Sequence, residues 1–196
     1  MSIIKGKQLR EWPRDLFKTF DRWEALGSVN MPDGARLIGH VPHIAPLAYL
    51  HRIPAPLSDA GFASLSETVG IILPIEIREF YACANGLSAF SSQIEIYGVR
   101  QNYGRADLLA ASAQPFSVET PNRFERPSGM MRSQAVVASY RDGSRIIVDE
   151  GNVLTRCARE NAQKVFEVWP GFRAWLTSEI ARLDAFFDDG GKQRRV

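Results

Sequence analysis

The chain has 196 residues, 45% of them hydrophobic and 10% aromatic, which is enough apolar material for a sizeable core and excludes general disorder. Its formal net charge of +2 is too small to indicate a nucleic-acid partner, and no apolar segment has membrane-spanning length or the form of a signal peptide. We therefore expect a soluble cytoplasmic protein with one domain, or with one domain and an extension.

Residues 1–57 predict one helix followed by an irregular, proline-rich extension. Trp12-Pro13 is typical of a helix start, and Gly27 is typical of a helix end. The apolar face of this helix contains four large side chains: Leu16, Phe17, Phe20 and Trp23. Prolines recur between residues 32 and 56 and argue against long regular elements. An ordered loop or a short strand pair that wraps the core is expected there, with a brief edge strand at Leu37, Ile38 and Val41.

Two short helices are predicted between residues 58 and 86. Ser58 can cap the first helix, which ends at Gly70. Pro74 suits the start of the second helix, and Asn85-Gly86 suits its end. Five side chains at helical spacing form one apolar stripe on the second helix: Leu73, Ile77, Phe80, Tyr81 and Ala84. Such a pair of helices needs a sheet to cover.

An antiparallel sheet is predicted for the second half of the chain. The expected strands cover residues 94–99, 135–140, 144–148, 153–157 and, as an edge strand, 165–168. Asp142-Gly143 lies between two of them and is favoured in hairpin turns, because both residues accept positive φ. A further turn is expected at Glu150. Residues 114–129 contain several prolines and predict a long surface loop, preceded by a short helix at residues 107–111.

The chain is expected to close with a helix that starts at Pro170. Its apolar face contains Phe172, Leu176, Ile180, Leu183 and Phe187. Residues 188–196 form a basic tail that we expect to be frayed. The predicted fold class is α+β, with a mostly antiparallel sheet packed by N-terminal and C-terminal helices.

Residues 66–86 carry a further pattern: a helix, a hydrophobic-Leu-Pro step, a short helix with an aromatic centre, and Asn-Gly. Together with the later strand, irregular insert, Asp-Gly hairpin and aromatic closing helix, this order resembles the SUKH superfamily. That group contains fungal Smi/Knr cell-wall regulators and bacterial toxin-immunity proteins. The resemblance covers residues 58–187 and leaves out residues 1–57 and 188–196.

The resemblance implies an intracellular immunity protein that binds and neutralises a polymorphic bacterial toxin by occlusion, with no turnover. A regulatory protein-protein interaction scaffold of the Smi/Knr type is the alternative, and a divergent enzyme is the third interpretation. Immunity proteins against nucleases are often acidic, and this chain is not. That departure favours a toxin that is not a nuclease, or an acidic surface that is local.

No catalytic, metal or cofactor site is predicted. His40, His43 and His51 are the only histidines, but prolines interrupt their segment and no acidic residue lies nearby to complete a ligand set. Packing or loop roles are therefore favoured over a metal site. Cys83 and Cys157 lack the spacing of a zinc or redox motif, so we expect buried free thiols. The sequence has no P-loop and no nucleophile elbow.

The partner surface is expected on the loop between residues 101 and 131, together with the turns at Asp142 and Glu150. Loops on a rigid sheet often bind partners, and this loop is long for a compact domain. The proposed anchors on this loop are Tyr103, Arg105, Arg123 and Phe124. Arg141 is the proposed anchor on the hairpin turn. Arginines and aromatics are enriched at protein interfaces and can also hold RNA, although the net charge does not favour nucleic acid.

Two alternatives to this partner surface stay open. One is a solvated sheet edge with ordinary core aromatics. The other is binding through the exposed face of the first helix, by Arg14, Lys18 and Arg22.

Overall fold

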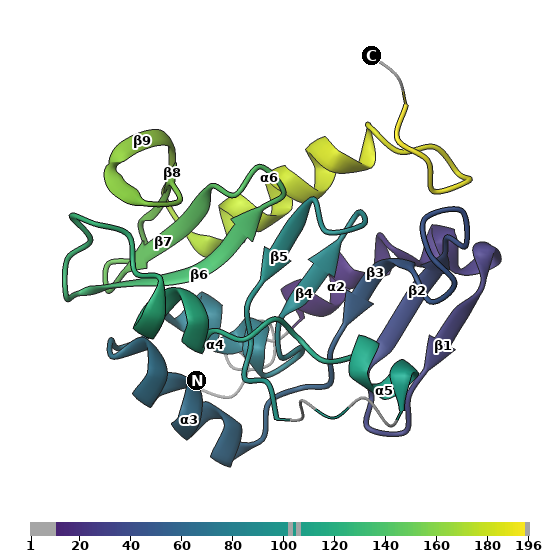
Figure 1. Cartoon of the computed structure of the whole chain (residues 1–196), viewed down its shortest axis with the longest axis horizontal. Helices are drawn as coiled ribbons and strands as arrows, with labels where there is room; N and C mark the ends of the chain where they lie inside the picture. Colours follow the sequence, from purple (N-terminus) through teal and green to yellow (C-terminus); the bar gives the residue numbers. More distant parts are fainter. Residues whose placement is uncertain (1–10, 102–103, 105–106, 195–196) are drawn as a thin grey trace, which may run out of the picture.

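The computed structural model describes residues 11–101, 104 and 107–194, and within them nine antiparallel strands form one sheet in sequence order (Figure 1). The strands are β1 (Ser28–Asn30), β2 (Arg36–His40), β3 (Tyr49–Ile53), β4 (Leu87–Ala89), β5 (Ile94–Ile96), β6 (Gln134–Tyr140), β7 (Arg145–Asp149), β8 (Leu154–Ala158) and β9 (Asn161–Trp169). The helical segments are α2 (Trp12–Lys18), the 3-10 helix η1 (Asp21–Leu26), α3 (Asp59–Val69), α4 (Ile75–Tyr81), α5 (Leu108–Ser112), the π-helical turn η2 (Thr120–Phe124) and α6 (Phe172–Asp184). The predicted α+β class is confirmed.

Helices α2, α4 and α6 pack together on one face of the sheet. The ring centroid of Phe172 in α6 lies 5.3 Å from that of Phe80 in α4 and 6.3 Å from that of Trp12 in α2. The indole N–H of Trp175 donates a hydrogen bond to the Tyr140 hydroxyl, which ties α6 to β6. Phe80 is fully buried, so its predicted place in the core against the closing helix is confirmed.

The N-terminal helix is shorter than expected. α2 ends at Lys18, and the chain continues as the 3-10 helix η1. At the junction the Thr19 hydroxyl donates to the Leu16 carbonyl at 2.6 Å, a side-chain bond that competes with the α-helical ladder. The apolar face is nevertheless buried as predicted, at Leu16, Phe17, Phe20 and Trp23.

The proline-rich segment is more regular than its composition suggests. Strands β1, β2 and β3 lie within it, and the prolines fall in the connections, where no ladder N–H is required. Leu37 and Ile38 belong to β2, which lies between β1 and β3, so the prediction of an edge strand there is wrong. Residues 11–57 share the sheet and the main hydrophobic core with residues 58–187.

The two helices predicted between residues 58 and 86 form as α3 and α4. The Ser58 side chain caps α3, and the predicted apolar stripe of the second helix is buried, at Leu73, Ile77, Phe80, Tyr81 and Ala84. However, α4 ends at Tyr81 rather than at Asn85-Gly86. The Asn85 side chain instead makes two 2.8 Å hydrogen bonds with the backbone of Val99, so it holds the segment that follows β5 and does not end the helix.

The β6–β7 hairpin forms at the predicted turn with a different geometry. Of Asp142 and Gly143, only Gly143 has a positive φ, of 86°. Asp142 contributes through its side chain, which accepts hydrogen bonds from the Ser144 amide at 2.9 Å and from the Ser144 hydroxyl at 2.6 Å. Strand β8 and the edge strand β9 follow in the predicted order.

Two segments expected to be irregular are built into the fold. In the predicted surface loop Asn122 is buried, and its side chain bonds the Val136 backbone of β6 at 2.8 and 2.9 Å. The expectation of a frayed tail is wrong for residues 188–194, because the Asp188 carbonyl accepts the indole N–H of Trp23 at 3.0 Å. Long-range side-chain bonds therefore order segments that have no periodic pattern of their own.

Candidate functional site

A row of polar side chains crosses the sheet on the face turned away from α6. Arg52 pairs with Ser88, Ser88 with Glu95, Glu95 with Ser139, and Ser139 with Arg145, from β3 to β7. Residues directly opposite one another in an antiparallel sheet point to the same face. We call these five residues the polar row.

One half of the polar row is a buried hydrogen-bonded network. The Glu95 carboxylate accepts from the Ser88 hydroxyl at 2.7 Å and from the Arg52 guanidinium at 3.1 Å. Burial raises the pKa of Glu95, and the Arg52 charge and the serine hydroxyls oppose that shift. Arg52 therefore compensates a carboxylate that would otherwise be costly to bury.

The other half of the polar row lies under a small cavity. Arg145 is 6% exposed and donates to the Tyr97 hydroxyl and, at 2.8 Å, to the Glu125 carboxylate. Arg159 donates to the same carboxylate at 2.9 Å. A cavity of about 260 Å³, which we call the row pocket, is lined by Glu95, Tyr97, Phe116, Ser139, Arg145 and Arg159. Its size suits a single side chain.

A second cavity lies on the opposite face of the same hairpin. Ser139 and Tyr140 are neighbours on β6 and therefore point to opposite faces, the first to the row pocket and the second to this cavity. The second cavity measures about 250 Å³ and lies between the β6–β7 turn and the C-terminal part of α6. We call it the turn cleft, and its lining includes Tyr140, Arg141, Asp142, Arg156, Arg182 and Phe186.

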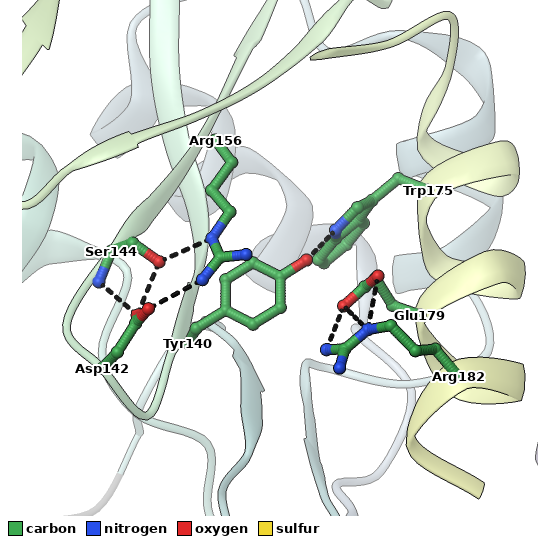
Figure 2. A network of polar contacts seen from close by, with 7 residues as sticks. All are labelled: Tyr140, Asp142, Ser144, Arg156, Trp175, Glu179 and Arg182. Atoms are coloured by element: carbon green, nitrogen blue, oxygen red, sulfur yellow. Dashed lines mark hydrogen bonds and ion pairs between the residues drawn. The ribbon is translucent and has the colours of Figure 1, made fainter. Parts of the chain in front are cut away.

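Arg156 lines the turn cleft, and its guanidinium lies between the side chains of the turn and the Tyr140 ring (Figure 2). Its guanidinium carbon lies 4.2 Å from the centroid of the Tyr140 ring, in cation–π contact. Its Nε donates to the Ser144 hydroxyl at 2.9 Å and its Nη2 to the Asp142 carboxylate at 2.7 Å. The Asp142 side chain thus fixes both the turn and the arginine of β8 beside it.

On the α6 side the turn cleft is lined by Arg182, which forms an ion pair with Glu179 (Figure 2). Arg182 donates to both carboxylate oxygens of Glu179, through Nε at 3.0 and 3.1 Å and through Nη2 at 2.7 Å. Glu179 is 5% exposed, so its carboxylate is buried, whereas the Arg182 side chain is exposed to solvent. Burial raises the pKa of Tyr140, which keeps its hydroxyl neutral at physiological pH.

The structure separates the partner-binding residues predicted from the sequence. Arg141 and Asp142 lie together at the turn cleft, whereas Glu150 lies at the opposite end of β7 and accepts a hydrogen bond from the backbone of Ile72 at 3.4 Å. Tyr103 and Arg105 lie outside the described residues. The loop between residues 101 and 131 and the two turns therefore do not form one surface.

Arg123 and Phe124 lie on η2, beside α3. The Arg123 guanidinium pairs with Glu119 at 3.0 Å and with Glu67 of α3 at 3.7 Å. Phe124 is 76% exposed. Arg123 thus has partners within the chain, and Phe124 offers an exposed ring to solvent.

The sequence analysis did not identify six residues of the two cavities as site residues: Glu95, Ser139, Arg145, Arg156, Glu179 and Arg182. The alternation of Ile94, Glu95 and Ile96 predicts that Glu95 points away from its neighbours. It does not predict which residues of other strands lie beside Glu95, because that depends on the register between strands.

The histidines are placed apart from both cavities. His51 is fully buried, and its ring stacks on Phe20 with a centroid distance of 4.0 Å. His40 is within 2.9 Å of the Pro46 carbonyl through Nε2. Within residues 11–101, 104 and 107–194, no group of three or more histidine, cysteine, aspartate or glutamate side chains is placed to hold a metal ion.

The two cysteines are free thiols, with Cys157 buried and Cys83 partly buried. Burial raises the pKa of Cys157 to about 11, so its thiol is protonated at neutral pH. These placements agree with the packing role expected for both residues.

Comparison of the chain with protein-family models and with curated proteins found no match. No helix in the described part of the chain is long and apolar enough to cross a membrane. Any statement about function therefore depends on the chemistry of the two cavities and of the hairpin turn between them.

Proposed function

We propose that this chain is a SUKH-type immunity protein that neutralises a bacterial protein toxin by binding it. The observation that carries the proposal is the hairpin turn from Arg141 to Ser144, which has a side-chain-sized cavity on each face. Arginine and aromatic side chains line both cavities. These residue types are enriched at the centres of protein interfaces, where they contribute most of the binding energy.

The hairpin turn is well suited to recognition because it is held in one conformation. Asp142 bonds Ser144 and Arg156, so both sides of the turn are fixed before any partner arrives. A preorganised surface loses less conformational entropy on binding than a mobile loop does. The turn also joins β6 and β7, which are interior strands of the sheet.

The proposed place of action is the cytoplasm, where delivered toxins reach their targets. Two free cysteines support a reducing compartment, because surplus thiols in an oxidising compartment tend to form disulfides. Binding by occlusion requires neither a metal nor a cofactor, and none is proposed.

The test uses the C-terminal domain of a large secreted toxin encoded immediately upstream of this gene. Co-expression with this chain is expected to restore growth, and the two proteins are expected to co-purify as a complex. Co-expression with an unrelated immunity protein is the control and should leave the toxin active. Absence of any complex would overturn the proposal, and rescue without a complex would favour the divergent enzyme instead.

A further inference from the structure

We propose that the turn cleft receives one acidic side chain of the protein partner, with Arg141 as the cation that recognises it. This inference rests on the proposed function and names the chemistry of the partner at one position. Its basis is the hydrogen bonding of the three arginine side chains that line the cleft, Arg141, Arg156 and Arg182.

Arg141 carries the uncompensated charge. Its backbone amide is anchored to the Gln93 carbonyl at 3.1 Å, and its side chain is exposed at the mouth of the cleft. Across the described residues no hydrogen bond or ion pair engages its guanidinium. An arginine that is fixed at its backbone and free at its head group is available to a ligand.

The other two arginines are oriented but not saturated. Arg156 uses Nε and Nη2 on Ser144 and Asp142, and Arg182 uses Nε and Nη2 on Glu179. Within the described ranges neither Nη1 atom has a hydrogen bond, and neither is a buried atom without a partner. Each therefore offers N–H donors, held in place by its own carboxylate, to a group that enters the cleft.

The charge balance selects a carboxylate. Arg156 is paired with Asp142, Arg182 is paired with Glu179, and Tyr140 is neutral, so Arg141 is the guanidinium of the cleft without a carboxylate partner among the described residues. One aspartate or glutamate side chain would neutralise it. A nucleic acid gains affinity from many phosphate contacts, and a cleft of about 250 Å³ has room for one such group.

The shape of the cleft agrees with a side chain as the occupant. A volume of about 250 Å³ accommodates a carboxylate on a short aliphatic stem. The rings of Tyr140 and Phe186 and the side chain of Leu183 provide apolar contacts for that stem. The occupant therefore has an apolar stem and a single negative charge, as glutamate and aspartate do.

The experiment measures the affinity of the same C-terminal toxin domain for four forms of this chain: wild type, Arg141→Glu, Arg141→Ala and Arg132→Glu. Arg132 is the matched control, because it is exposed and lies at the other end of the hairpin from the cleft. Arg141→Glu is expected to weaken binding about 10- to 100-fold and Arg141→Ala by a smaller factor, while Arg132→Glu changes it by less than about threefold. Because Arg141 is exposed, the melting temperature of each variant should match that of the wild type.

A charge swap then identifies the occupant. Acidic surface residues of the toxin domain are changed to lysine one at a time, and one of these changes is expected to restore binding to Arg141→Glu. If the wild type binds but Arg141→Glu binds as well as Arg132→Glu, the inference is wrong and the proposed function stands. If no acidic residue restores binding, or if a labelled single-stranded RNA competes for the cleft, the assignment of a carboxylate is overturned. If the wild type itself does not bind, the proposed function fails first.

Discussion

Replacing His51 should change how the stability of the protein depends on pH. His51 is fully buried, stacked on Phe20 at 4.0 Å and with its ring centroid 4.8 Å from that of Trp23. Its Nε2 atom is buried and has no hydrogen-bond partner within the described residues. Burial, with a smaller contribution from the Arg22 charge, lowers the pKa of His51 well below 6.5. The native state therefore holds this ring neutral.

The sign of the effect follows from the direction of that shift. Below pH 6.5 the unfolded chain protonates His51 and the native chain does not, so the unfolded state binds more protons. The stabilising contribution is complete above the unfolded pKa and is lost as the pH falls toward the folded pKa. The slope of the free energy of unfolding against pH approaches about 1.4 kcal/mol per pH unit. The free energy of unfolding therefore falls by about 1.4 kcal/mol between pH 7.5 and pH 5.5.

The assay is urea denaturation followed by tryptophan fluorescence at pH 5.5, 6.5 and 7.5. Between pH 7.5 and pH 5.5 the free energy of unfolding should fall by about 1.4 kcal/mol less in His51→Phe and in His51→Leu than in the wild type. This difference is expected whatever the absolute stability of each variant. His43→Gln is the matched control, because it removes a histidine from an exposed position and leaves the buried core intact. Equal pH dependence in the wild type and both His51 variants would show that the native ring takes up a proton over the same pH range as in the unfolded chain, contrary to its burial.

Three further predictions concern the core, the histidines and the partner surface. Phe80→Ala should lower the free energy of unfolding by about 3–5 kcal/mol, because the ring is fully buried against Phe17 and Phe172, and an unchanged melting temperature would contradict that packing. Elemental analysis of the purified protein should find no stoichiometric metal; one zinc or iron per chain, lost in a His40→Ala, His43→Ala double variant, would establish a site that we do not predict. Alanine substitutions at Arg123 and Phe124 should weaken toxin binding if η2 contributes to the interface. If toxin binding is weakened only by alanine substitutions at Arg14, Lys18 and Arg22, recognition belongs to the N-terminal helix instead.

The helices could be predicted where their signals are local. The stripe on α4 and the apolar face of α6 follow from residues three and four positions apart, and both are buried as expected. The end of α4 could not be predicted in the same way, because the Asn85 side chain bonds the backbone of Val99, which lies 14 positions further along the chain. Strand β4, Leu87–Ala89, is too short to show an alternating pattern, and it was not predicted.

The candidate site was predictable only at the hairpin turn. Asp-Gly places a turn at Arg141 and Asp142 from local chemistry alone. The polar row depends on the register of five strands, β3 to β7, that are separated by helices and loops. The distance between Asp142 and Glu150 likewise depends on β7, which puts the two turns at opposite ends of one strand. Tertiary pairing, and not residue type, decides which charged side chains meet.

Titration of toxin activity with the purified chain tests the central claim most directly. A protein that neutralises by occlusion should lower the activity of the C-terminal toxin domain in proportion to the amount added, and activity should reach zero at about one equivalent. The residual activity should not change with further incubation. Complete inactivation by a small fraction of an equivalent, progressing with time, would mean turnover and would contradict a binding mechanism.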